Sequence, residues 1–280
     1  MLYSKVELKE ILKKAKEKEC VLGSDYDLEK LIMSMVENLG DVDLELRDEL
    51  IFDVFSCMAL NDKLSDELLK KVFNVLLEQK FLFVGIEEKE SDFVFKRSFT
   101  NLFFAVIVYK HRENKFLSNN DIEILIKNIF EYMKKEKDYR GYVQEKGWAH
   151  SIAHLADVVD ELACCEETKE NDYIQFLELL KNLIEINDYV YINGEDERIT
   201  TAVLSIFNNL NEAFLKEWIS SFDKFKKIGR HPEDMNIKVN IKNFLRSLYF
   251  RILREHKFFN LIEDVEKTLE IINWEIFKII

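Results

Sequence analysis

The chain has 280 residues, of which 48% are hydrophobic and 33% charged, and its formal net charge is −13. This balance supports a sizeable core, while the acidic charge argues against a nucleic-acid-binding surface, which is usually basic. One proline and 7 glycines are too few for the turns that sheets and hairpins need. The composition therefore predicts an all-α protein.

Apolar residues recur at helical spacing from one end of the chain to the other. Ser65 and Asn119 stand where an N-cap is expected. Pro232 lies where a helix is predicted to begin, which is the position at which the missing N–H of a proline does least harm. The segments 80–93 and 188–197 resist this pattern and are expected to be loops. The predicted helices are 4–20, 27–39, 44–60, 65–81, 91–110, 119–136, 146–165, 170–185, 196–210, 212–226, 233–255 and 259–275.

These helices pair into about six antiparallel helical hairpins of about 45 residues, a length typical of HEAT and armadillo-like repeats. The units share no visible sequence signature, so the predicted repeat is one of geometry. An α/α superhelix is the first choice, and a closed α/α toroid and two packed helical bundles remain alternatives. No linker-like segment divides the chain, which predicts a single helical-repeat domain over residues 1–280.

The four cysteines are Cys20, Cys57, Cys164 and Cys165, and no C-x-x-C occurs. The adjacent pair cannot form a bridge without strain, so buried or inert thiols in a reducing cytoplasm are expected. The N-terminal segment contains no apolar signal-peptide core. The longest apolar run, residues 102–109, is far short of the ~20 residues that span a bilayer. We therefore expect a cytoplasmic protein without a membrane partner.

The segment "RGYVQEKGWAHSIAHLADVVDELA", residues 140–163, contains two of the five histidines. On a helix with about 100° per residue and His150 at zero, His154 falls near about +40°, Asp157 near about −20° and Glu161 near about +20°. Apolar residues occupy the opposite side. The pattern predicts a narrow polar stripe along an otherwise apolar helix.

Three interpretations of this stripe stay open. Histidines at i and i+4 can chelate a divalent metal, with Asp157 completing the site or orienting His154. Alternatively, the stripe belongs to a non-metal binding site or hydrogen-bond network, in which Arg140 would neutralise an anion and Trp148 would supply a flat wall. It can also be purely structural. The zinc-protease form H-E-x-x-H is absent, because Ser151 follows His150.

A second polar cluster, residues 193–204, places Glu195, Asp196 and Glu197 at a helix start, where the dipole stabilises carboxylates, and Arg198 follows. Its alternative interpretation has these acids facing the His150 helix. Arg246 and Arg251 lie on an otherwise apolar helix. They are expected to pair with acids on neighbouring helices, for which Asp196 and Glu197 are candidates. Phosphate-binding loops and hydrolase elbows are missing from the sequence.

The segments "DYRGYVQEKGWAHSIAHLADVVDELA", "GEDERI", "FLRSLYFRIL" and "KRSFTNL" together resemble a bacterial family of helical proteins, domain of unknown function 2785. The resemblance extends from about residue 90 to 255 and implies an all-helical, superhelical fold. It brings no activity, cofactor or catalytic residue with it. The residues in these segments that we predict to form one polar groove are Arg97, Arg140, Gly141, Trp148, His150, His154, Asp157, Glu195, Asp196 and Arg198.

Two functions follow as hypotheses. The first is a helical-repeat module whose groove binds a protein, peptide or small molecule. The second is a metal-dependent hydrolase that uses His150, His154 and Asp157 as ligands of a divalent metal or as an acid–base set.

Overall fold

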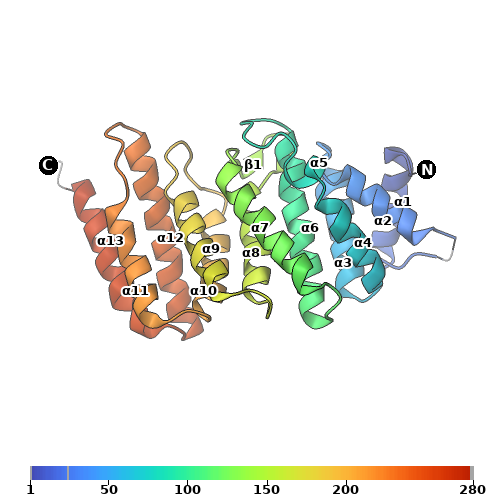
Figure 1. Cartoon of the computed structure of the whole chain (residues 1–280). Coiled ribbons are helices and arrows are strands. Elements are labelled where there is room, and N and C mark those ends of the chain that lie inside the picture. Colours follow the sequence, from blue (N-terminus) through green and yellow to red (C-terminus); the bar gives the residue numbers. More distant parts are fainter. Residues whose placement is uncertain (1, 24, 278–280) are drawn as a thin grey trace. The chain divides into compact units, whose positions relative to one another are not determined.

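The computed structural model describes residues 2–23 and 25–277, and its helices form two compact units, unit 1 from Met1 to Glu167 and unit 2 from Thr168 to Ile280. The described residues are helical apart from one short hairpin and the connections (Figure 1), which confirms the all-α prediction. The single domain over residues 1–280 stays a prediction.

Several helices of unit 1 begin at residues whose side chains cap them. Ser4 and Ser118 form capping boxes at α1 and α7, and Ser65 caps α4 by accepting from the amide of Leu68. The predicted cap at Asn119 is wrong by one residue, because Ser118 and Asp121 exchange hydrogen bonds there. The elements are α1 (Lys5–Glu17), α2 (Leu28–Asn38), the π-helix η1 (Glu45–Phe52), α3 (Asp53–Leu60), α4 (Asp66–Leu76), α5 (Gln79–Leu82), α6 (Phe93–Glu113), α7 (Asn119–Lys135), β1 (Tyr142–Val143), β2 (Gly147–Trp148) and α8 (Ser151–Ala163).

Helix α6 lies at the centre of unit 1, where it packs against α3, α4, α5 and α8. Most of its apolar side chains are buried, and the Phe103 ring stacks on that of Phe55 from α3 with centroids 4.1 Å apart. Helices α6 and α8 run parallel, since Ser98 contacts His154 near their starts and Arg112 pairs with Glu161 near their ends.

Unit 2 repeats this parallel arrangement with α10 and α12, because Asp196 contacts Ser247 and, further along, Thr201 contacts Arg251. Parallel packing of alternate helices is typical of stacked helical hairpins, but the HEAT-like repeat itself stays a prediction. The elements are α9 (Glu170–Ile184), α10 (Glu195–Phe207), α11 (Glu212–Ser220), the 3-10 helix η2 (Ser221–Lys224), α12 (Glu233–Glu255), η3 (Phe259–Leu261) and α13 (Ile262–Phe277). Within the described ranges, no helix has the length and apolarity that crossing a membrane requires.

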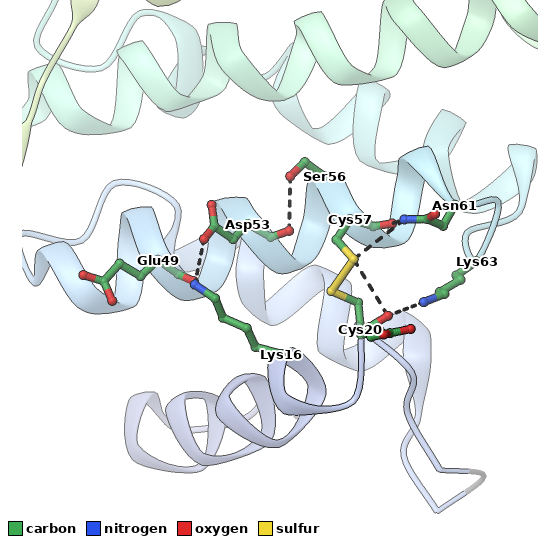
Figure 2. Close-up of a disulfide and its surroundings, with 9 residues drawn as sticks. Lys16, Cys20, Glu49, Asp53, Ser56, Cys57, Asn61 and Lys63 are labelled. Carbon is green, nitrogen blue, oxygen red and sulfur yellow. Dashed lines mark hydrogen bonds and ion pairs between the residues drawn. A yellow bond between two sulfur atoms is a disulfide. The ribbon is translucent and has the colours of Figure 1, made fainter.

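The expectation of four free thiols is wrong for two of them. Cys20 and Cys57 form a disulfide, with their Cα atoms 6.3 Å apart (Figure 2). The two cysteines are 37 residues apart in the sequence, and this spacing does not indicate that the end of α1 lies against α3. Cys164 is exposed and Cys165 is buried as free cysteines, and burial raises the pKa of the Cys165 thiol to about 12.

Candidate functional site

A β-hairpin replaces the first turn of the helix that the sequence predicts over 146–165. Strands β1 and β2 pair Tyr142 with Trp148, and Gly147 has a φ of +80° that favours glycine. His150 follows in the left-handed region at φ 46°, and its amide donates to the carbonyl of Gly141 at 3.0 Å. Helix α8 therefore begins only at Ser151. His150 precedes the helix, and the helical angle assigned to it is wrong.

The hairpin is held by Arg47 of the π-helix η1, a residue with no sequence signal for this role. Its fully buried guanidinium donates to the carbonyls of Lys146 at 2.6 Å and Asp41 at 2.7 Å, and it lies 4.2 Å from the ring centroid of Phe95. Burial lowers the pKa of Arg47, while the carboxylate of Asp48 opposes the shift. Arg47 thus joins elements about a hundred residues apart in the chain.

The aromatic rings around the two histidines form a continuous series. Trp148 is 40% exposed and stacks on His150 with centroids 4.2 Å apart, and Tyr142 meets Trp148 edge-on at 4.9 Å. The ring of His150 contacts that of His154 at 5.6 Å in a perpendicular arrangement. The series leads from an exposed aromatic surface to a buried histidine.

His154 is buried and its Nδ1 lies 2.7 Å from the hydroxyl of Ser98 on α6. The Ser98 hydroxyl also donates to the carbonyl of Ala149. Because the serine proton is used in that bond, Nδ1 of His154 is the donor to Ser98. A serine that hydrogen-bonds in this way is not activated as a nucleophile, so the pair connects α6 to the start of α8.

Two of the three arginines of the predicted groove, Arg97 and Arg140, belong to unit 1, and both pair with acids there. Arg97 is fully buried, makes two hydrogen bonds with Glu136 at 2.8 and 2.9 Å, and donates to the carbonyls of Val84 and Gly85. Burial alone would lower the pKa of Arg97, but the hydrogen bonds and charge of Glu136 outweigh it and raise the pKa. Arg140 pairs with Asp138 in the same manner.

Further along α8 the polar stripe lines an open pocket. Its volume is about 380 Å³, and we call it the acidic groove. The pKa of Glu161 is raised by burial, although its ion pair with Arg112 opposes this shift. The acidic groove has an apolar floor and an acidic wall, formed by Leu60, Leu102, Ala105, Val106 and Tyr109 and by Asp157, Asp160 and Glu161 respectively.

The metal prediction gains no support from this geometry. His154 directs Nδ1 to Ser98, and the rings of His150 and His154 are perpendicular. Across the part of the chain that the structure describes, no group of three or more His, Cys, Asp or Glu side chains is arranged to hold a metal.

The remaining predicted residues belong to unit 2. Glu195 is buried and accepts from the amide of Asn193 at 2.8 Å, and burial raises its pKa. Asp196 accepts from the hydroxyl of Ser247 at 2.5 Å, and Arg198 is exposed. Pairing of Arg251 with Glu197 is confirmed, with the two charged groups 3.9 Å apart.

Several residues that shape unit 1 were not predicted from the sequence. Ser98, Glu136 and Asp138 each complete a contact of a predicted residue, and Arg47 anchors the hairpin. Asp160 joins the acidic groove although it lies outside the predicted stripe. For Glu136 a signal exists in retrospect, because a buried arginine requires an acid partner, but the sequence does not show which acid lies near.

Fold and site together define an all-α protein with a hairpin-capped pair of parallel helices and an adjoining acidic groove. Residues 82–250 match the family described as Protein of unknown function (DUF2785), and the chain belongs to this family, as the resemblance of its motifs predicted. The match covers the hairpin, α6 and α8 of unit 1 and much of unit 2. No curated protein and no solved structure matches the chain.

Proposed function

We propose that the chain is a cytoplasmic helical binding module whose acidic groove receives a basic side chain, arginine or lysine, from a partner protein or peptide. The observation that carries the proposal is the composition of the groove, three carboxylates beside an apolar floor. Long basic side chains have an apolar stem and a charged end, so the stem can contact the apolar floor while the charged end pairs with the carboxylates.

The size and charge of the groove favour this class of ligand over others. A volume of about 380 Å³ is at the small end of ligand pockets, which suits one or two side chains better than a larger molecule. The net charge of −13 opposes anionic partners such as nucleic acid. Arg112 already pairs with Glu161 at one end of the groove, which is the type of contact that a partner's arginine would make with the aspartates.

The metal-dependent hydrolase is not proposed, because no observation favours it. Of the three predicted metal ligands, His154 is buried and hydrogen-bonded to Ser98, and the ring of His150 is stacked on that of Trp148.

A fluorescent peptide that alternates leucine and arginine tests the proposal, with a peptide that has glutamate in place of arginine as its counterpart. Fluorescence polarisation should show saturable binding of the first peptide only, weakened by salt because the contact is ionic. Asp160→Asn should weaken binding at least about tenfold, since a hydrogen bond to a charged group is worth about 1.5–3 kcal/mol. Leu60→Ser, on the floor of the groove, should weaken it as well.

Glu166→Gln is the matched control, because the Glu166 side chain is 88% exposed and lies outside the groove. The substitution removes the same charge as Asp160→Asn. Equal losses in the Asp160 and Glu166 variants would show that only the net charge attracts the peptide. Such a result would overturn the proposal.

A further inference from the structure

The disulfide between Cys20 and Cys57 lies beside a second pocket, separate from the acidic groove. Cys20 follows α1 with a φ of +60°, and Cys57 belongs to α3 (Figure 2). The pocket has a volume of about 330 Å³, and only Cys20 of the two cysteines lines it. Its lining consists of Cys20, Val21, Leu22, Gly23, Tyr26, Leu28, Met58 and Lys63. A molecule in this pocket lies next to Cys20, which is 5% exposed.

Polar groups around the disulfide suit the release of Cys57 as a thiolate. Lys63 is the charged residue in the pocket lining, and its ammonium donates to the carbonyl of Glu19, next to Cys20. The side-chain amide nitrogen of Asn61 lies 3.8 Å from the sulfur of Cys57 (Figure 2). Nearby cations and N–H donors stabilise a thiolate, and a better leaving thiolate speeds exchange.

We propose that Cys20–Cys57 is a thiol-exchange site for a small anionic thiol. The ligand enters the pocket with its carboxylate toward Lys63, and its thiolate sulfur attacks the sulfur of Cys20. A new S–S bond joins the ligand to Cys20, the Cys20–Cys57 bond breaks, and its electron pair leaves on Cys57. The ligand thiol has given its proton to water and the Cys57 thiolate takes one from water, so no further oxidant or reductant is needed.

Contacts that do not involve sulfur keep the change local. The ammonium of Lys16 pairs with Asp53 at 2.7 Å and donates to the carbonyl of Glu49 at 2.8 Å, which holds α1 against η1 and α3 (Figure 2). Leu8 and Leu12 of α1 are fully buried. Exchange therefore removes the covalent link between Cys20 and α3 while the helices of unit 1 stay packed.

Glutathione is the probe, applied to the full chain with Cys164→Ser to remove the exposed free thiol. Cys165 is buried with a pKa of about 12 and should not react. After an acid quench, intact mass and peptide mapping should find one glutathione on Cys20 and a new thiol on Cys57, with an unchanged circular dichroism spectrum. Lys63→Met should slow the reaction about fivefold through the loss of its positive charge, whereas Lys14→Met, at an exposed site on α1, should not.

Four results would overturn the proposal. The first is a count of four thiols instead of two in the untreated wild-type chain, denatured without reductant. The second is glutathione on Cys57 instead of Cys20, and the third is a native chain that does not react under conditions in which the denatured chain does. The fourth is an equally slow reaction of the Lys63 and Lys14 variants.

Discussion

The two ends of the α6–α8 pair use polar side chains in opposite ways. At the first end, Arg97, Ser98 and His154 are buried, and their hydrogen bonds are made to Glu136, to backbone carbonyls and to one another. At the other end, Asp157 and Glu161 line the acidic groove. Both ends belong to the same two helices, so helical periodicity alone does not distinguish them.

The segments that cover each end account for the difference. The hairpin and the connection that follows α5 cover the first end and supply carbonyl acceptors for Arg97 and Ser98. At the second end, α3 contributes Leu60 to the floor and an open pocket of about 380 Å³ remains. Polar side chains therefore stabilise the fold where loops enclose them, and they are accessible to a ligand where loops do not.

The largest effect is expected from Arg97→Met at the covered end. The substitution removes both hydrogen bonds to Glu136 and leaves a fully buried carboxylate without its cation. Breaking a buried ion pair on one side costs about 3–5 kcal/mol, and we expect a loss of this size in the free energy of unfolding, measured with urea.

Two further variants sharpen this test. Lys96→Met, at the adjacent position and 4.0 Å from Glu37, should cost at most about 1 kcal/mol, because the two side chains are 21% and 50% exposed and water screens this ion pair. The double variant Arg97→Met/Glu136→Gln should recover part of the stability, since the neutral amide no longer requires a cation. A loss near 1 kcal/mol for Arg97→Met would mean that the covered end is not a closed network.

A smaller effect is expected from Gly147→Ala in the hairpin, and Gly194→Ala serves as its control. Their φ values are +80° and +83°, so both alanines meet the same backbone strain of about 1–2 kcal/mol. A Cβ at 147 would lie 3.0 Å from Nη2 of Arg47, whereas a Cβ at 194 meets nothing within 4 Å. We expect Gly147→Ala to cost about 1 kcal/mol more than Gly194→Ala by urea unfolding. Equal costs would show that the hairpin yields without disturbing Arg47.

Much of the fold could be predicted from the sequence, because helices are encoded locally. The N-terminal ends of α4 and α12 follow from Ser65 and Pro232, and most predicted helices agree with the structure to within a few residues. The hairpin was missed because its signal is weak: each strand has only two residues, and His150 adopts a positive φ that few residues other than glycine favour.

The site was less predictable than the fold, for a physical reason. The stripe of His154, Asp157 and Glu161 was read from spacing, and these residues do share the side of α8 that meets α6. Which of them is buried depends on residues far away in the chain. His154 meets Ser98 and Phe99 of α6, whereas Glu161 pairs with Arg112 beside an open pocket. Periodicity contains no information on such contacts, nor on the partner of Cys20.

The smallest effect, and one that distinguishes the groove from the surface, concerns pH. Burial raises the pKa of Glu161, so the folded chain binds this proton more tightly than the unfolded chain does. The stability from this group is greatest below the ordinary pKa of the unfolded carboxyl and is lost as pH rises through the folded pKa. Between about pH 4 and 7, the free energy of unfolding of Glu161→Gln relative to wild type should therefore increase.

Glu113 gives the opposite sign in the same experiment, because its hydrogen bond with Lys110 lowers its pKa. Its stabilising contribution is present above the pKa of the unfolded carboxyl and disappears as pH falls, so Glu113→Gln should become less stable relative to wild type as pH rises. Urea unfolding of both variants at a series of pH values measures the two slopes. If the slopes have the same sign, the Glu161 carboxylate is hydrated like that of a surface residue, and the wall of the acidic groove is then more open than its burial indicates.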